Sequence, residues 1–285
     1  MMETICVAGA GTMGSGIALA FAQAGLSTIL FEINETVLSN AGNYIEGILN
    51  NQVIKQKISE DEKQLIFSRI LFTHQIENCQ ADLIIEAIIE KLQAKEQLFQ
   101  NLAAINFPQT ILASNTSSLS ISAIQKNIPH PERIAGMHFF NPANIMKLVE
   151  VVKGDKTSDE VIKQIINICH HIKKTPVLCI DAPGFIVNRV ARPYYLEAMK
   201  LVEDNKATIE TVDEVMEACG FKMGPFKLMD LIGLDINLAV STSVYEAMNK
   251  PERFKPSAMQ QQKVASGALG RKSGKGFYIY NKENK

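Results

Sequence analysis

The chain has 285 residues, of which 29 are Lys or Arg and 30 are Asp or Glu, so its formal net charge is −1 at pH 7. Because the charge is balanced and no run of like charge is long, the sequence argues against nucleic acid or a membrane surface as the partner and favours a small molecule. Five cysteines without a Cys-x-x-Cys pair argue against a disulfide framework or a zinc site and favour a reducing compartment.

Length and hydropathy set further bounds. At about 150 residues per domain, the length suggests two domains. The first predicted strand begins almost at once, which leaves no room for a signal peptide, and no apolar stretch approaches the roughly 18 residues of a membrane helix. We therefore expect a cytoplasmic protein that holds no metal.

The N-terminal segment has the order strand, glycine turn, helix, strand, acid. Thr4–Ala8 is an apolar run without polar alternation, which is typical of a parallel strand buried on both faces. The glycine-rich stretch 9–14 follows, and helix-forming residues continue from Ser15 to Ala24. A second strand is predicted over Ser27–Phe31, and it ends in Glu32.

This context gives each glycine of the motif Gly-Ala-Gly-Thr-Met-Gly a function. Gly9 permits the tight turn, Gly11 lets the backbone approach a pyrophosphate, and Gly14 allows close packing of helix on strand. Glu32 stands close to where a dinucleotide site needs an acid for the ribose hydroxyls. The segment predicts a dinucleotide site, with a plain tight turn as the alternative.

Two helices are predicted next, over residues 34–49 and 59–68, the second with a capping box at its start. Lys55 and Lys57 lie between them. These side chains could meet an anionic group such as a nucleotide phosphate, although a solvated face is the commoner role of such lysines.

Polar residues follow two further buried strands. Glu90 and Lys95 come just beyond the strand Ala81–Glu86, at the edge where open α/β sheets bind ligands, and a helix is predicted over 91–104. Asn115-Thr-Ser-Ser118 comes directly after the strand 111–114, at that same edge. Hydroxyl and amide groups there suit hydrogen bonds to a nicotinamide or a substrate oxygen, but they are also common N-caps, so we expect a mixed role.

The segment from Gly136 to Val152 carries the candidate chemistry. Two strands, 134–139 and 148–152, flank a turn-forming Asn-Pro-Ala-Asn, so a hairpin would bring His138 and Glu150 together. A carboxylate beside an imidazole fixes the tautomer and stabilises the imidazolium, which makes the histidine a proton acceptor near neutral pH. The alternative is a buried histidine paired for structural reasons, but the long polar connection favours a functional one.

The remaining sequence predicts the second domain. An amphipathic helix over 159–173 and a strand over 176–180 complete an α/β domain with a mostly parallel sheet, residues 1–182. An all-α domain follows over residues 183–285, with helical segments at 185–204, 208–219 and 226–249 and a glycine-rich turn leading into a short strand at 277–280. Asn188 lies near this boundary and could point toward the hairpin, although an asparagine there is also a common cap or surface residue.

Taken together, these residues resemble the L-3-hydroxyacyl-CoA dehydrogenase family, and within it the bacterial 3-hydroxybutyryl-CoA dehydrogenases. The resemblance runs nearly end to end and rests on eight stretches in the same order. They are Gly-Ala-Gly-Thr-Met-Gly (9–14), Glu-Ala-Ile-Ile-Glu (86–90), Ser-Asn-Thr-Ser-Ser-Leu (114–119), Met-His-Phe-Phe-Asn-Pro (137–142), Met-Lys-Leu-Val-Glu-Val (146–151), Pro-Gly-Phe-Ile-Val-Asn-Arg (183–189), Met-Gly-Pro-Phe (223–226) and Gly-Arg-Lys-Ser-Gly-Lys-Gly-Phe-Tyr (270–278).

The resemblance implies a Rossmann-type N-terminal domain, NAD as cofactor, an acyl-CoA substrate and a homodimer active in fatty acid β-oxidation. It implies that His138 is the catalytic base with Glu150 as its partner, and that Ser117 and Asn188 hold the substrate. Lys55 and Lys57 lie in the region that would touch coenzyme A. The residues that fall where the family contacts NAD are Gly9, Gly11, Thr12, Met13, Gly14, Glu32, Glu90, Lys95, Asn115, Ser117 and Asn141.

Three positions depart from the family pattern. Asn144 replaces a second proline in the Asn-Pro loop, Lys173 replaces a glycine near the last strand, and Lys222 replaces a proline before Met-Gly-Pro. None of them removes a catalytic group.

The expected reaction interconverts L-3-hydroxybutyryl-CoA and acetoacetyl-CoA. His138 takes the proton of the 3-hydroxyl as the hydride leaves for NAD, and Glu150 offsets the charge that develops on the ring. One alternative is a dehydrogenase of the same fold that acts on a free hydroxy acid or sugar acid. The other is a non-catalytic nucleotide-binding protein, against which the intact pair of side chains counts.

Overall fold

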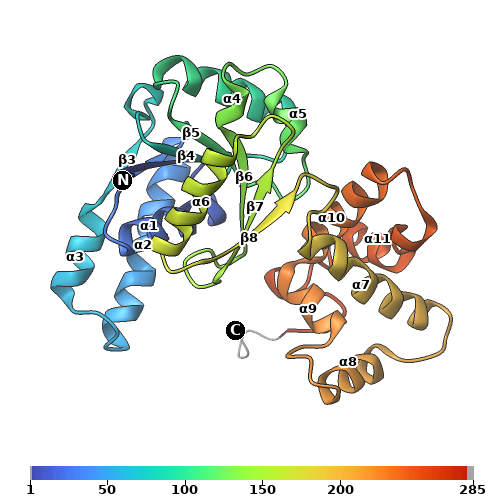
Figure 1. The fold of residues 1–285 in the computed structure, drawn as a ribbon. Coiled ribbons are helices and arrows are strands. Elements are labelled where there is room, and N and C mark those ends of the chain that lie inside the picture. The colour runs from blue at the N-terminus through green and yellow to red at the C-terminus, as the bar shows by residue number, and fades with distance from the viewer. Residues whose placement is uncertain (1, 281–285) are drawn as a thin grey trace. The chain divides into compact units, whose positions relative to one another are not determined.

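The computed structural model describes residues 2–280, which form two compact units that divide between Ala182 and Pro183 (Figure 1). The first unit is a sheet with helices packed on it. The second consists of helices and short connecting segments.

The sheet of the first unit has eight strands in the order β3-β2-β1-β4-β5-β6-β7-β8. All neighbouring strands are parallel except β6 and β7, which form an antiparallel pair. The chain moves outward from β1 in one direction and then continues from β4 in the other, and ligands bind at such a switch point, beyond the carboxyl ends of the strands. The strands are β1 Thr4–Ala8, β2 Ser27–Phe31, β3 Ile70–Thr73, β4 Leu83–Glu86, β5 Ile111–Ser114, β6 Ile134–Phe139, β7 Leu148–Lys153 and β8 Thr175–Ile180.

The helices of the first unit confirm most of the predicted elements. They are α1 Thr12–Gln23, α2 Glu35–Ile54, α3 Glu60–Ser68, α4 Leu92–Ile105, α5 Ile121–Gln125 and α6 Asp159–His171. The capping box is present, because Ser59 and Glu62 exchange hydrogen bonds at the start of α3. The sequence did not indicate β3 or α5, since four or five residues are too few to show a period.

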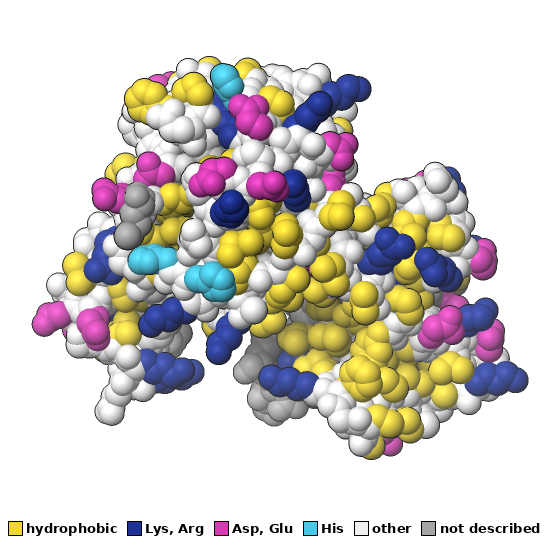
Figure 2. Space-filling model, in the orientation of Figure 1, with side chains coloured by type: hydrophobic (Ala, Val, Ile, Leu, Met, Phe, Trp, Pro, Cys, Tyr) yellow, Lys and Arg dark blue, Asp and Glu magenta, His cyan; other side chains and the backbone are white. Residues whose placement is uncertain are grey.

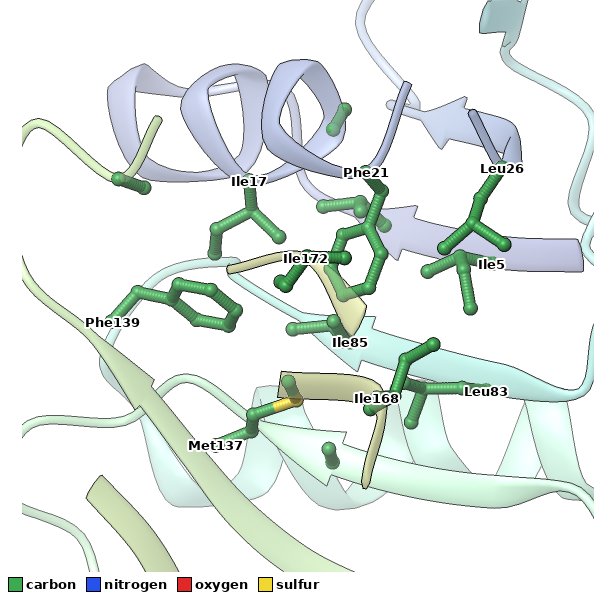
Figure 3. Packing of buried hydrophobic residues seen from close by; sticks show 14 of the residues in the cluster. Ile5, Ile17, Phe21, Leu26, Leu83, Ile85, Met137, Phe139, Ile168 and Ile172 are labelled. Atoms are coloured by element: carbon green, nitrogen blue, oxygen red, sulfur yellow. The ribbon is translucent and has the colours of Figure 1, made fainter. Parts of the chain in front are cut away.

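A single hydrophobic core covers one face of the sheet. Side chains of α1 and α6 interdigitate there with alternate residues of the strands (Figure 3). Phe139 of β6 reaches into this core and meets Phe21 of α1 edge to face, with ring centroids 6.4 Å apart. Because successive side chains of a strand point to opposite faces, His138 points to the other face of the sheet.

Lys173, one of the departures from the family pattern, lies just after α6 at φ 57°. Glycine adopts this left-handed region without steric cost, whereas a residue with a Cβ does not. The position therefore explains why a glycine is usual there. Of the other two departures, Asn144 is half-buried and Lys222 is exposed, and nothing in their surroundings explains the residue type.

The second unit consists of α7 Val187–Glu203, α8 Ile209–Ala218, α9 Pro225–Ile232, α10 Leu234–Ala247 and α11 Ala258–Ala265. The prediction of one helix over 226–249 was wrong. The chain bends by 101° between α9 and α10, where Gly233 has φ 102°. Among the described residues no single helix is long and apolar enough to span a membrane, although the bent pair α9 and α10 passes by length and composition.

Asp230 of α9 organises the end of the described chain. Its carboxylate accepts hydrogen bonds from the backbone N–H groups of Phe277 and Tyr278 and from the hydroxyl of Tyr280. A Cβ at Gly276 would lie 2.0 Å from this carboxylate, so the glycine-rich segment is needed for close packing. The predicted strand over 277–280 was wrong, because only isolated bridges form there.

Candidate active site

The hairpin of β6 and β7 brings two titratable side chains into contact. His138 and Glu150 are direct partners in the antiparallel register, and Nδ1 of His138 lies 2.7 Å from Oε2 of Glu150. Both residues are buried, and the ring of Phe140 packs on the imidazole with centroids 4.6 Å apart. The predicted pairing of the two side chains is confirmed. A carboxylate at Nδ1 fixes the tautomer and the orientation of the imidazole ring.

The glycine turn after β1 has the geometry of a phosphate-binding turn. Gly9 has φ 107°, and a Cβ there would lie 2.6 Å from the carbonyl oxygen of Ala87. A Cβ at Gly14 would lie 1.7 Å from the carbonyl oxygen of Gly9, whereas at Gly11 it would meet nothing within 4 Å. Gly11 is also the N-cap of α1 and supplies no side chain to the first N–H groups of the helix. Thr12 and Met13 form the first turn of α1. The glycine-rich stretch 9–14 thus places open space at Gly11 next to the N-terminus of a helix, where a diphosphate can bind.

Glu32 follows β2 and is fixed beside this turn. Its Oε2 accepts a hydrogen bond from the N–H of Ala10, and its Oε1 accepts one from the N–H of Asn34, both at 3.1 Å. Each oxygen keeps a second lone pair that can accept from a ribose hydroxyl. The turn and the carboxylate thus fit the diphosphate and the ribose of NAD.

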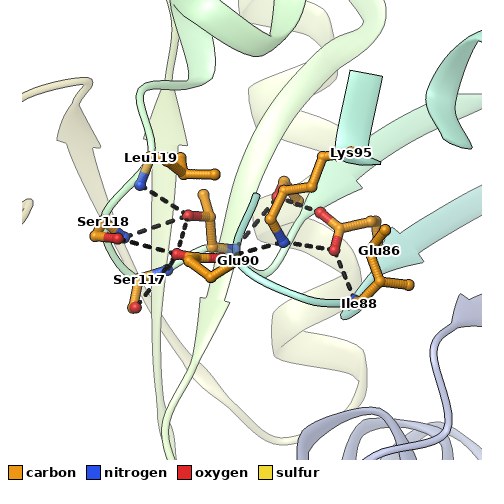
Figure 4. A network of polar contacts seen from close by, with 9 residues as sticks. Glu86, Ile88, Glu90, Lys95, Ser117, Ser118 and Leu119 are labelled. Carbon is orange, nitrogen blue, oxygen red and sulfur yellow. Dashed lines mark hydrogen bonds and ion pairs between the residues drawn. The ribbon is translucent and has the colours of Figure 1, made fainter. Parts of the chain in front are cut away.

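A cluster of charged side chains, in which Lys95 and Glu86 are buried and Glu90 is exposed, lies at the carboxyl ends of β4 and β5 (Figure 4). Lys95 of α4 is 1% exposed, and its Nζ lies 2.6 Å from Oε1 of Glu86 and 3.1 Å from Oε2 of Glu90. Ser114 donates to the second oxygen of Glu86 at 2.6 Å. Burial outweighs the ammonium at Glu86 and raises the pKa of that carboxyl.

Glu90 orders the polar loop that follows β5. Its Oε1 accepts hydrogen bonds from the N–H of Ser117 at 3.0 Å and from the hydroxyls of Thr116 and Ser118. Burial raises the pKa of Glu90, but the charge of Lys95 and these hydrogen bonds outweigh burial and hold its pKa below the usual value. Ser117 is thereby held beyond the carboxyl ends of the strands, where sheets of this topology bind their ligands.

The loop between β6 and β7 is fixed from three sides. Oδ1 of Asn115 accepts from the N–H of Phe139 at 2.8 Å and so holds the backbone next to His138. Ala143 packs on α1, where a Cβ at Gly16 would come within 3.2 Å of it. The buried ammonium of Lys174 donates to the carbonyls of Ala143 at 2.6 Å and Met146 at 2.7 Å. The histidine hairpin and the glycine turn are therefore neighbours.

The remaining predicted site residues lie in the loop between β6 and β7, beyond α2 or in the second unit. Asn141 is exposed and precedes Pro142 through a cis peptide bond. Lys55 and Lys57 are exposed beyond the C-terminus of α2, roughly 30 Å of helix from its start. Asn188 lies in the first turn of α7, in the second unit.

Sequence reasoning missed Glu86 and Lys174. Glu86 ends a buried strand nine residues before Lys95, which was a usable signal for an ion pair. Nothing in the sequence pointed to Lys174, because its partners are backbone carbonyls. Within residues 2–280, no cluster of three or more His, Cys, Asp or Glu side chains could hold a metal ion.

The chain matches two models of one protein family. The model of the 3-hydroxyacyl-CoA dehydrogenase NAD binding domain matches residues 4–182, and the model of the C-terminal domain of that family matches residues 184–280. The two matches cover both units and together span nearly all of the described chain.

Individual relatives agree with the family match. The chain is 45% identical to a 3-hydroxyadipyl-CoA dehydrogenase of Escherichia coli over 284 residues, which cover 99% of this chain and 60% of that protein. It is 38% identical to a probable 3-hydroxybutyryl-CoA dehydrogenase of Deinococcus radiodurans, covering 96% of this chain and 99% of that protein. The crystal structure of an (S)-3-hydroxybutyryl-CoA dehydrogenase from Ralstonia eutropha superposes with a TM-score of 0.94 at 34% identity, covering 99% and 100% of the two chains. A crystal structure of a 3-hydroxybutyryl-CoA dehydrogenase from Escherichia coli has a TM-score of 0.95 at 45% identity, and this chain covers 60% of it.

Proposed function

The chain belongs to the 3-hydroxyacyl-CoA dehydrogenase family, and from this premise we propose that it oxidises the 3-hydroxyl group of a short-chain L-3-hydroxyacyl-CoA with NAD. The observation that carries the proposal is the contact of 2.7 Å between Nδ1 of His138 and Oε2 of Glu150 inside the NAD-binding domain of this family. A general base with a fixed tautomer is what alcohol oxidation requires of the protein.

His138 is the proposed general base, acting through Nε2. Glu150 holds the ring through Nδ1 and stabilises the imidazolium that forms when the substrate proton is taken. When bound, NAD supplies the hydride acceptor. In the reverse direction the imidazolium returns the proton to the oxygen of the ketone.

The proposed cofactor contacts come from the turn 9–14, Glu32 and the loop held by Glu90. The turn receives the diphosphate, because a bare backbone and uncapped N–H groups face open space at Gly11. Ser117 and Asn188 are the proposed substrate contacts, and Lys55 and Lys57 the proposed contacts to coenzyme A.

Two acyl groups are candidates for the substrate. The family pattern favours the four-carbon 3-hydroxybutyryl group. The relative at 45% identity bears the name of a dehydrogenase for the six-carbon, dicarboxylic 3-hydroxyadipyl group. Both acyl groups are short, and the enzyme is proposed to act in the oxidation of short-chain acyl-CoA esters. Its proposed location is the cytoplasm.

A homodimer is the proposed assembly. Hydrophobic side chains gather on the surface of the C-terminal unit (Figure 2). Among the exposed hydrophobic side chains of this unit are Val190, which is 72% exposed, and Ile236, which is 51% exposed. Exposed apolar side chains gathered in one region mark association surfaces. Sedimentation at micromolar concentration should give a dimer, and a monomer alone would contradict the proposal.

The activity test compares acetoacetyl-CoA with free acetoacetate while NADH absorbance is followed. We expect NADH oxidation with the thioester and none with the free acid. Turnover of the free acid would favour a dehydrogenase for hydroxy acids. NADH binding without turnover of either compound would favour a non-catalytic nucleotide-binding protein.

A further inference from the structure

Arg192 of α7 carries a buried positive charge with no carboxylate beside it. The residue is 3% exposed, and no ion pair among residues 2–280 includes it. Burial lowers the pKa of this guanidinium to about 10, so it stays charged at neutral pH. A charge taken out of water normally has an opposite charge nearby, because desolvation is costly. Lys95 in the first unit has two such carboxylates.

Most of the guanidinium is anchored by neighbouring groups. Nε donates to the backbone carbonyl of Asn188 at 3.1 Å. Nη1 donates to the carbonyl of Asn237 and to the hydroxyl of Ser241 on α10, both at 3.0 Å. The ring of Tyr195 covers the guanidinium at 4.9 Å. These contacts fix the orientation of the group without neutralising its charge.

The remaining nitrogen, Nη2, has different surroundings. Within the described residues Nη2 has no hydrogen-bond acceptor, and the nitrogen is not fully enclosed by protein atoms. Nη2 therefore keeps access to solvent or to a ligand. An anchored guanidinium with one accessible edge is the geometry that arginine uses to bind a carboxylate.

We propose that Nη2 of Arg192 binds the terminal carboxylate of a dicarboxylic 3-hydroxyacyl-CoA, so that Arg192 is a specificity residue for the acyl group. This inference rests on the proposed function, in which Asn188 contacts the substrate. Arg192 follows Asn188 by one helical turn, a rise of roughly 6 Å along α7. In an extended six-carbon diacid, C6 lies roughly 4 Å beyond C3, given bonds of about 1.5 Å. The distance from C3 to the terminal carboxylate oxygens is therefore compatible with the rise between Asn188 and Arg192 along α7.

The charge also disfavours other acyl groups. A six-carbon chain that ends in a methyl group would face the guanidinium without neutralising its charge, and would exclude solvent from it. A four-carbon chain ends before it reaches the charge. The preference should therefore depend on the terminal group when chain length is held constant.

The experiment measures kcat/KM for L-3-hydroxyadipyl-CoA and L-3-hydroxyhexanoyl-CoA, which differ only in the terminal group. For the wild-type chain we expect a preference for the adipyl substrate on the order of 10²-fold, as for a buried charge pair. Arg192→Met should reduce this ratio to near one, mainly by loss of activity on the adipyl substrate. Arg192→Lys, which keeps the charge, should retain part of the preference.

Arg133→Met is the matched control. Arg133 is also 3% exposed, and within residues 2–280 its guanidinium donates to the backbone carbonyls of Phe107 and Thr110. Its loss should lower stability but leave the ratio unchanged. If Arg192→Met does not fold, inhibition of the wild-type chain decides: adipyl-CoA should inhibit more strongly than hexanoyl-CoA.

Three results would overturn the inference. One is a wild-type ratio near one together with equal inhibition by the two acyl-CoA esters. Another is an equal loss on both substrates in Arg192→Met, which would make the residue purely structural. Failure of the wild-type chain to oxidise these two thioesters and L-3-hydroxybutyryl-CoA alike would overturn the proposed function and the inference with it, whereas activity without preference, or activity on L-3-hydroxybutyryl-CoA alone, would overturn the inference alone.

Discussion

The ammonium of Lys95 lies 2.6 Å from the carboxylate of Glu86 in a site where neither side chain is more than 1% exposed. Removing one partner of such a pair leaves the other charge buried without compensation. Lys95→Met should therefore lower the free energy of unfolding by about 3–5 kcal/mol, measured by urea denaturation. The double variant Glu86→Gln/Lys95→Met should recover part of the loss. A single variant as stable as the wild-type chain would contradict this account.

Glu90 should make stability depend on pH in the acidic range. Its pKa is lowered in the folded chain because Lys95 and the hydrogen bonds from Thr116 and Ser117 outweigh burial. Its stabilising contribution is thus present above the unfolded pKa of about 4.3 and is lost as pH falls through the folded pKa. The stability difference between wild type and Glu90→Gln should shrink over that range. Glu77→Gln, at an exposed carboxylate, is the control, and an equal change in stability in the two variants would contradict this account.

Much of the site follows from local patterns in the sequence. The spacing of glycines after β1 predicts the turn, and turn residues between two apolar runs predict the register that pairs His138 with Glu150. The pairing needs no information beyond the hairpin itself, because antiparallel neighbours are set by the position of the turn.

The missed features depend on contacts between distant segments. Lys174 holds carbonyls 28 and 31 residues away, and backbone acceptors leave no trace in residue type. The break at Gly233 was missed because a single glycine is tolerated within a helical pattern. Gly233 has φ 102°, and Asp230 just before it binds the backbone of Phe277 and Tyr278. Neither feature can be read from periodicity.

Lys173→Gly should stabilise the chain. Lys173 has φ 57°, a conformation that costs an L-residue about 1–2 kcal/mol and costs glycine little. Since glycine also loses more entropy on folding, we expect a net gain of up to about 1 kcal/mol in urea unfolding. The matched control is Lys163→Gly at an exposed position inside α6, which should destabilise by about 1 kcal/mol. Equal effects of the two substitutions would contradict the role of the left-handed conformation.

Glu32 should make the enzyme prefer NADH to NADPH. The N–H groups of Ala10 and Asn34 fix the carboxylate beside the glycine turn, where it would repel a 2′-phosphate. We expect kcat/KM for NADH to exceed that for NADPH by at least about 10²-fold, since the phosphate would add an unpaired like charge. Glu32→Gln should bring the two kcat/KM values closer together, because it weakens the binding of NADH and removes the repulsion of the 2′-phosphate of NADPH. Equal efficiency with both cofactors in the wild-type chain would show that Glu32 does not select between them.

His138 and Glu150 should act as one unit. Glu150→Gln keeps the size of the side chain and a hydrogen-bonding group but removes the charge that favours the imidazolium. We expect kcat to fall by roughly 10²–10⁴ in His138→Gln, and by a comparable or smaller factor in Glu150→Gln. The double variant should be no slower than His138→Gln, because a base without its partner and a partner without its base fail at the same step. NADH affinity should persist in all three variants, since the glycine turn and Glu32 are intact. Stopped-flow turnover and NADH titration measure both quantities, and a folded His138→Gln enzyme with wild-type turnover would place the chemistry elsewhere.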